Sequence, residues 1–98
     1  MCGVVAVIGK CLASSLVLEG LKKLEYRGYD SAGIATLSDG VINEVKSEGR
    51  VDNLEKNLVI KNMSGSVGIG HVRWATHGIP NTINAHPHSS ENVSIVHN

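Results

Sequence analysis

The chain is poor in cysteine and has no excess of charge of either sign. Its 98 residues include two cysteines, Cys2 and Cys11, which are too few for a disulfide framework and lack a C-x-x-C spacing. Nine basic and nine acidic residues cancel and are scattered along the chain. The cysteine count leads us to expect free thiols in a reducing cytoplasm. The balanced charge leads us to expect no nucleic-acid partner and no membrane partner.

Long hydrophobic runs are also missing. The apolar N-terminal stretch has no basic segment before it and is interrupted by Lys10, which argues against a signal peptide. No uninterrupted stretch reaches membrane-spanning length. With 98 residues, 42% of them hydrophobic, the chain fits one small domain at most.

The spacing of the hydrophobic residues predicts an α+β fold with a largely antiparallel sheet. Residues 3–8 form a continuous β-branched run, typical of a strand covered on both faces. Asp39-Gly40 predicts a tight hairpin turn between strands over 31–37 and 41–46. A strand over 67–74 contains glycines where we expect close backbone approach. A last strand, beginning at Val93, has no expected partner in the sequence, so we expect the sheet to be incomplete.

Two amphipathic helices are expected between these strands. The first covers residues 12–26, with a buried stripe formed by Leu12, Leu16, Val17, Leu21 and Leu24. The second covers about residues 51–59, with Val51, Leu54 and Leu58 on one side. Residues 75–92 are polar and are predicted to form a functional loop.

Cys2 directly follows the initiator methionine. Removal of Met1 would give one residue both a free α-amine and a thiol, which can act as base and nucleophile near neutral pH with a bridging water as proton carrier. The alternative is a small buried strand cysteine without a chemical role. Its position in the sequence does not decide between the two.

Three further segments concentrate polar side chains among small residues: 26–33, 71–78 and 84–88. Together with Cys2-Gly3 and His97-Asn98, they resemble the glutaminase part of the N-terminal-nucleophile class II glutamine amidotransferases, over the entire chain. The segments 74–78 and 84–88 favour the member of this family that aminates a sugar phosphate. The resemblance implies the αββα layers of N-terminal-nucleophile hydrolases, with mainly antiparallel sheets, incomplete in this chain.

The resemblance also implies catalytic roles for two residues. Cys2 would attack the side-chain amide of glutamine and form a thioester, and Asn98 would donate to the oxyanion of the tetrahedral intermediate. Arg27 and Gly28 would pack beside the nucleophile as supporting residues. We expect Gly28 to adopt a backbone angle that other residues resist.

Four residues would bind the glutamine substrate. Arg73 would grip the α-carboxylate, because a guanidinium meets a carboxylate with two hydrogen bonds. Trp74 would gate the passage of ammonia, and Thr76 and His77 would line the pocket. The alternatives are a surface ion pair for Arg73, a core aromatic for Trp74 and simple loop structure for the other two.

No metal or cofactor is expected, because the family uses no metal for this step. The histidines allow a rival interpretation, in which His86 and His88 bind a metal ion with His71, His77 or His97. Neither a cysteine nor a carboxylate stands at a recognised metal spacing with them.

The family pattern continues beyond Asn98, with further glutaminase strands and then sugar isomerase domains. We therefore expect residues 1–98 to be the N-terminal portion of a type 2 glutamine amidotransferase domain, weakly active or inactive alone. Its expected partners are glutamine, the downstream part of the enzyme and a second copy of the chain pairing at an exposed strand edge. The alternatives are a non-catalytic remnant that acts as a binding fragment, and another class II amidotransferase.

Overall fold

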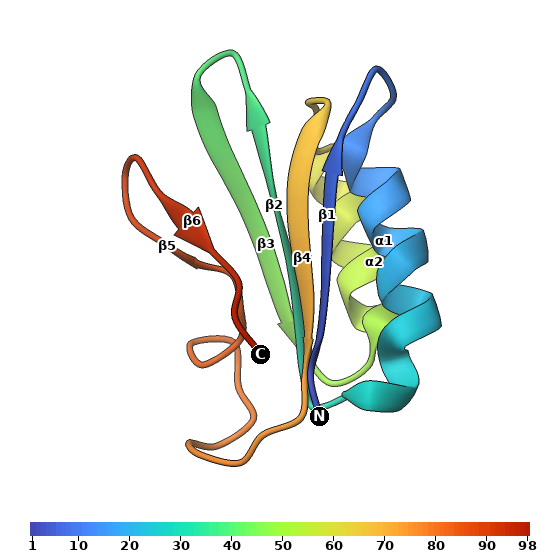
Figure 1. Ribbon diagram of the computed structural model, residues 1–98, viewed down its shortest axis with the longest axis vertical. Coiled ribbons are helices and arrows are strands. Elements are labelled where there is room, and N and C mark those ends of the chain that lie inside the picture. The colour runs from blue at the N-terminus through green and yellow to red at the C-terminus, as the bar shows by residue number, and fades with distance from the viewer.

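The computed structural model describes the backbone of residues 1–98 and the side chains of all residues except 58–61. The elements in chain order are β1 (Gly3–Ile8), α1 (Ala13–Leu24), the 3-10 turn η1 (Glu25–Arg27), β2 (Ser31–Ser38), β3 (Val41–Glu48), α2 (Val51–Lys61), β4 (Val67–Arg73), β5 (His88–Ser89) and β6 (Ser94–Ile95). The α+β prediction is confirmed (Figure 1).

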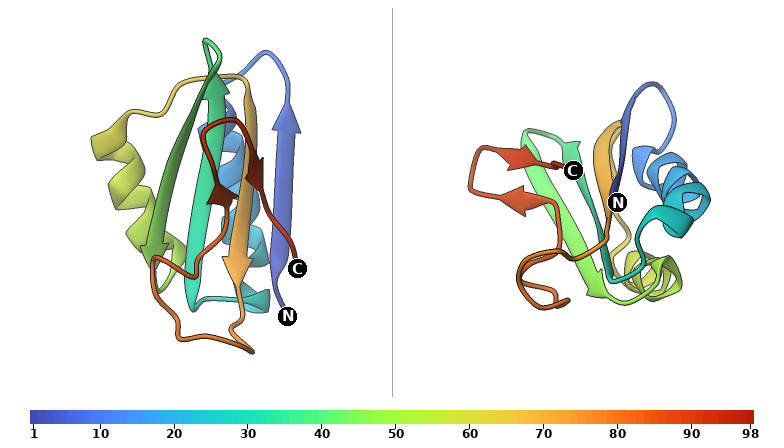
Figure 2. Two further views of the ribbon diagram at one scale, coloured as in Figure 1. Left: turned by 90° about the vertical axis from the view of Figure 1, so that its left-hand side faces the viewer. Right: turned by 60° about the horizontal axis from the view of Figure 1, so that its bottom comes forward.

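A four-stranded antiparallel sheet in the order β1-β4-β2-β3 forms the centre of the molecule. Both helices cover one face of this sheet, whereas the segment after β4 and the β5–β6 hairpin lie on the opposite face (Figures 1 and 2). Among the described residues, neither helix is long and apolar enough to cross a membrane.

Glycines of β4 allow α1 to lie close to the sheet. A Cβ atom at Gly68 would lie 3.1 Å from Ala13 Cβ, and one at Gly70 would overlap Val17 Cγ1. The predicted close approach at these glycines is therefore confirmed. The fully buried core that results contains Val17, Leu21, Ile34, Leu54 and Val72.

The predicted hairpin is also confirmed. Asp39 and Gly40 join β2 to β3 with φ angles of 51° and 75°, and two central residues of positive φ match the right-handed twist of the strands. The second helix begins at Val51, and Val51 and Leu54 are buried as expected. Leu58, the third residue of that expected stripe, lies among the side chains that are not described.

Two predictions about burial are wrong. β1 packs on the helices with one face only, through Val5 and Val7, and the alternate residues Val4 and Ile8 are exposed, Ile8 to 87%. In α1, the residues that face the sheet are Ala13, Val17 and Leu21, which recur every fourth position and meet the glycines of β4. Leu12 and Leu16 precede Ala13 and Val17 by one residue and turn away into solvent.

The last strand was expected to lack a partner, and this is wrong. Ser94–Ile95 pairs antiparallel with His88–Ser89, within the segment predicted to be a loop. The remainder of that segment is irregular, as expected. It packs on β2 at Gly33, where an added Cβ would overlap the carbonyl oxygen of His86.

Candidate active site

Cys2 and the end of β4 meet at one edge of the sheet. Gly3 pairs with Val72, so the same register places Cys2 across from Arg73. The backbone N–H of Trp74 donates a hydrogen bond to Cys2 Sγ at 3.3 Å, and the thiol faces the Trp74 carbonyl oxygen at 3.7 Å. The N-terminal segment and the 71–78 segment are therefore in direct contact.

Arg27 holds the backbone of the nucleophile candidate. Its Nε donates to the carbonyl oxygen of Cys2 at 3.1 Å, and its Nη2 lies 3.7 Å from the sulfur of Met1. Arg27 belongs to the η1 turn after α1, so the first helix fixes the start of β1 through this side chain. This placement agrees with a supporting role.

Gly28 is required for a different reason from the one expected. Its φ is −173°, an extended conformation open to any residue, so the expected special backbone angle is wrong. The constraint is space, because an added Cβ would lie 2.6 Å from the carbonyl carbon of Arg73 and 2.8 Å from the nitrogen of Trp74. Gly28 lets η1 touch the peptide that contacts Cys2.

Two residues of the 26–33 segment have structural roles that the sequence did not assign. Asp30 Oδ2 accepts the N–H of Ala75 at 2.7 Å, and the Asp30 N–H donates to the Arg73 carbonyl at 3.1 Å. The ring of Tyr29 meets Trp74 edge to face, with centroids 5.7 Å apart. The only signal in the sequence was their membership of a polar segment rich in small residues.

A cleft of about 260 Å³ opens beside the Cys2 sulfur. It is lined by Met1, Cys2, Arg27, Trp74, Thr76 and Asn98. An adjoining hollow of about 250 Å³ also contains Cys2, Arg27 and Asn98 on its wall, so Asn98 reaches the nucleophile candidate from the far end of the chain. The structure thus brings together most of the residues predicted to form the site.

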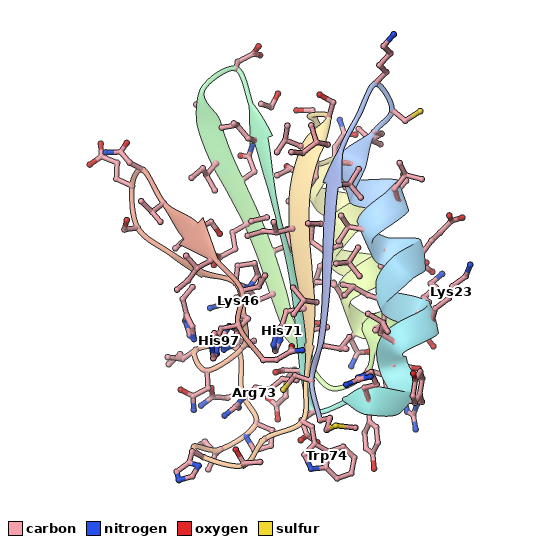
Figure 3. All side chains as sticks on the ribbon, in the orientation of Figure 1. Lys23, Lys46, His71, Arg73, Trp74 and His97 are labelled. Atoms are coloured by element: carbon pink, nitrogen blue, oxygen red, sulfur yellow. The ribbon has the colours of Figure 1, made fainter. Side chains whose placement is uncertain are left out.

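Arg73 and His77 are placed differently from the cleft residues. Arg73 is only 9% exposed, and its guanidinium donates to the carbonyl oxygens of Ile79 at 3.2 Å, Gly78 at 3.4 Å and His77 (Figure 3). No ion pair of Arg73 occurs among the described residues. The His77 ring is exposed and does not line the cleft. Arg73 therefore holds the 77–79 loop through its carbonyl oxygens.

Trp74 lies at the surface of the site and not in the core. It is 44% exposed, and one of its sides is fixed by Tyr29. The Arg50 guanidinium lies 5.0 Å from the centre of the Tyr29 ring, a cation–π contact that helps to hold this ring in place. The core-aromatic alternative is therefore wrong.

Three histidine rings lie one after another, His71 in β4 and His86 and His88 in the segment that follows it. The His71 and His86 rings lie 4.3 Å apart at 23°, and His88 follows at 4.4 Å from His86. Burial lowers the pKa of His71 to about 4, and burial followed by the nearby His88 lowers the pKa of His86. Among the described side chains, no group of three or more His, Cys, Asp or Glu residues is arranged to hold a metal ion.

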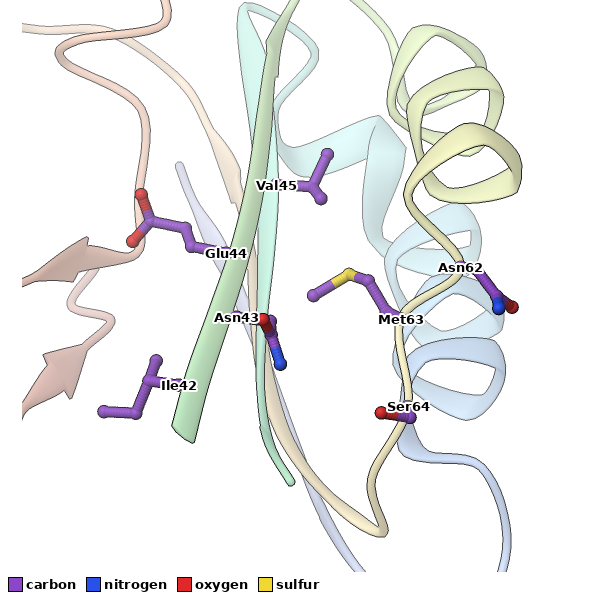
Figure 4. Close-up of a pocket in the computed structure, with 7 residues that line it drawn as sticks. All are labelled: Ile42, Asn43, Glu44, Val45, Asn62, Met63 and Ser64. Carbon is purple, nitrogen blue, oxygen red and sulfur yellow. The ribbon is translucent and has the colours of Figure 1, made fainter. Parts of the chain in front are cut away.

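A second pocket lies apart from these residues. It has a volume of about 280 Å³ and lies between β3 and the segment after α2 (Figure 4). Its lining is Ile42, Asn43, Glu44, Val45, Asn62, Met63 and Ser64. It contains none of the residues predicted to form the site.

Comparison with known proteins assigns the family. No protein family model matches the chain. Curated relatives named glutamine–fructose-6-phosphate aminotransferase [isomerizing] align with all of it, at 58% identity in Clostridium acetobutylicum, 52% in Mesorhizobium japonicum and 54% in Pyrococcus horikoshii. The chain spans only 16% to 17% of the length of these relatives.

A solved structure supports the same assignment. The glutamine phosphoribosylpyrophosphate amidotransferase from B. subtilis superposes with a TM-score of 0.76 and 29% identity, over 93% of this chain and 20% of that one. The chain therefore belongs to the glutamine–fructose-6-phosphate aminotransferase family, corresponds to its N-terminal segment and has the fold of the N-terminal-nucleophile amidotransferases.

Proposed function

We propose that this chain forms the glutamine-hydrolysing site of a glutamine–fructose-6-phosphate aminotransferase, with Cys2 as its nucleophile. The observation that supports this most is the Cys2 sulfur, which lies on a cleft shared with Thr76 and Asn98 and accepts the Trp74 N–H at 3.3 Å. An N–H donor directed at sulfur stabilises negative charge on it.

The reaction begins once Met1 has been removed and the Cys2 α-amine is free. The amine takes the thiol proton through a water molecule, and the sulfur attacks the amide carbon of glutamine. Asn98 donates to the oxyanion of the tetrahedral intermediate. The carbon–nitrogen bond then breaks, the leaving nitrogen takes the proton from the α-ammonium group, and ammonia departs. Water hydrolyses the remaining thioester to glutamate and restores the thiol.

The substrate is held by the segment that follows β4. In the structure, Nη1 and Nη2 of Arg73 donate to loop carbonyls, so a two-bond contact with the α-carboxylate of glutamine would require Nη2 to exchange at least one of its carbonyl partners for the substrate. Thr76 lines the cleft, and His77 belongs to the loop that Arg73 organises. Trp74 stands at the mouth of the cleft, where it would gate the departure of ammonia.

The ammonia would be used by the downstream part of the polypeptide, which converts fructose 6-phosphate to glucosamine 6-phosphate in the cytoplasm. Val4 and Ile8 alternate along β1 with Val5 and Val7, which pack towards the core, so they lie on the opposite face of the strand, are exposed and offer this part a surface on which to pack. The outer edge of β1 is unpaired within the sheet, so it could also bind a second copy of the chain. Without its downstream part, the chain is expected to be weakly active or inactive.

A chimaera tests the proposal. Residues 1–98 would replace the aligned N-terminal segment of the C. acetobutylicum relative, and glutamate release from glutamine would be measured with fructose 6-phosphate present. Cys2→Ser is expected to abolish release, whereas Cys11→Ser provides a matched control because Cys11 is an exposed free cysteine. Release that survives Cys2→Ser would contradict the proposal.

A further inference from the structure

A buried histidine connects the central strand of the sheet to the segment that carries Asn98. His71 lies in β4, is fully buried, and has its Nε2 2.9 Å from the carbonyl oxygen of His97 (Figure 3). Because a carbonyl oxygen only accepts hydrogen bonds, Nε2 must carry the hydrogen in this contact. The ring therefore carries a hydrogen on Nε2.

The surroundings of His71 keep this donor uncharged. His71 Nδ1 is buried and has no hydrogen-bond partner among the described residues, so no group on that side favours a second proton. The groups that face the ring are His86 and His88 from the loop and Arg73 from its own strand, and none of them is an anion. Burial lowers the pKa of His71 to about 4, so the ring is neutral at physiological pH.

The segment after β6 has few other attachments. Ser94–Ile95 pairs only with the short strand β5, and residues 96–98 form no regular element. Among the described contacts, the hydrogen bond from His71 is the one that joins residues 96–98 to the four-stranded sheet. Asn98 is the next residue along the chain, and it lines the cleft beside Cys2.

We propose that His71 is a positioning residue, which fixes Asn98 at the cleft by donating a hydrogen bond to the carbonyl oxygen of His97. This inference rests on the proposed function, in which Asn98 donates to the oxyanion. His71 touches neither the substrate nor the reacting atoms. It sets the distance from the oxyanion donor to the place where negative charge develops, and such donors act only over a narrow range of distances.

The expected effect is confined to the chemical step. Loss of one oxyanion donor lowers turnover by about a hundred- to a thousandfold. A donor that is displaced but still present should cost less, so we expect kcat to fall by about tenfold or more without the bond from His71. Arg73 and Thr76 are unchanged, so KM for glutamine should change by less than about threefold.

The test compares substitutions of similar length at two histidines in the chimaera. His71→Met removes the donor and His71→Gln keeps an N–H donor, while His88→Met and His88→Gln are the matched controls at an exposed ring next to His86. We expect His71→Met to lose kcat selectively, His71→Gln to recover most of it and both controls to resemble the parent. Equal kcat in His71→Met and His71→Gln, or a rise in KM alone, would overturn the proposal.

A spectroscopic measurement needs no altered protein. In the 98-residue chain at neutral pH, ring-nitrogen NMR should show His71 with its hydrogen on Nε2. A hydrogen on Nδ1, or a doubly protonated ring, would overturn the proposal even if His71→Met failed to fold. Cys2→Ser separates the two hypotheses, because activity that survives it contradicts the proposed function. An inactive Cys2→Ser beside a fully active His71→Met contradicts only the positioning role.

Discussion

The backbone N–H of Trp74 donates to the sulfur of Cys2 at 3.3 Å, although the two residues lie 72 positions apart in the chain. The contact depends on β4 lying beside β1, on Gly28 leaving room beneath the Arg73–Trp74 peptide, and on Arg27 binding the Cys2 carbonyl. Cys2 is thus held by the Arg73–Trp74 peptide and by the hydrogen bond to its own carbonyl oxygen. Residues that fix the Arg73–Trp74 peptide should therefore affect activity even where they do not line the cleft.

Asp30 should affect activity although it does not line the cleft. Its carboxylate accepts the Ala75 N–H at 2.7 Å and so fixes the peptide after Trp74. A hydrogen bond to a charged group contributes about 1.5–3 kcal/mol, so Asp30→Ala should lower kcat/KM for glutamate release in the chimaera by about tenfold or more. Asp30→Asn retains an acceptor oxygen and should be much less impaired. Equal activity of the two variants would show that this hydrogen bond does not matter.

Gly28→Ala should destabilise the protein. The new Cβ would lie 2.6 Å from the Arg73 carbonyl carbon, and overpacking of this kind costs about 1–3 kcal/mol. Gly9→Ala is the control, because a Cβ at Gly9 meets no atom within 4 Å. Urea unfolding should show a lower midpoint for Gly28→Ala only. Equal midpoints for both variants would contradict the close approach of η1 to β4.

Arg73→Lys should weaken glutamine binding. A lysine cannot provide the planar pair of donors that meets a carboxylate, and it cannot replace the hydrogen bonds to the carbonyls of the 77–79 loop. We expect KM for glutamine to rise by about tenfold or more. Arg50→Lys serves as the control, because Arg50 is exposed and a lysine keeps the positive charge beside the Tyr29 ring. Steady-state kinetics of the chimaera measure both, and an unchanged KM in Arg73→Lys would remove Arg73 from the substrate site.

Stability should depend on pH through His71. In the unfolded chain this ring gains a proton as pH falls through 6.5, whereas in the fold burial delays protonation to about pH 4. Between these values the unfolded chain binds more protons. Acidification therefore lowers the free energy of unfolding. The loss begins as the pH falls below about 6.5 and reaches up to about 3 kcal/mol near pH 4, the pKa of His71 in the fold.

His71→Gln isolates this effect, because His86 is present in both proteins. Urea unfolding at pH 7, 5.5 and 4.5 should show a smaller loss of stability on acidification in His71→Gln than in the parent chain. The same slope in both proteins would show that His71 does not cause the pH dependence.

Much of the fold follows from local patterns in the sequence. The Asp39-Gly40 turn and the helix starting at Val51 depend on neighbouring residues, and both are confirmed. The exposed face of β1 could not be predicted, because it depends on where the segment after β4 packs, and that segment lies on β2 at Gly33. β5 has only two residues, which is too short to show a period.

The site was predicted in part because its residues belong to stretches that carry the family resemblance: Cys2-Gly3, 26–33, 71–78 and His97-Asn98. The sequence placed Cys2, Arg27, Trp74, Thr76 and Asn98 in one site, and they line one cleft. It could not show that Arg73 bonds to loop carbonyls or that Gly28 is selected by space, since both depend on contacts between segments. The hydrogen bonds of Asp30 and His71 were missed for the same reason.

The most direct test of the account is the chemical state of Cys2. The chimaera would be treated with a diazoketone analogue of glutamine, and its N-terminal peptide would be analysed by mass spectrometry with and without excess glutamine. The account predicts a peptide that begins at Cys2, carries one label on that residue, and is protected by glutamine, with Cys11 unlabelled. A fully active protein that retains Met1, or a label shared equally with Cys11, would contradict it.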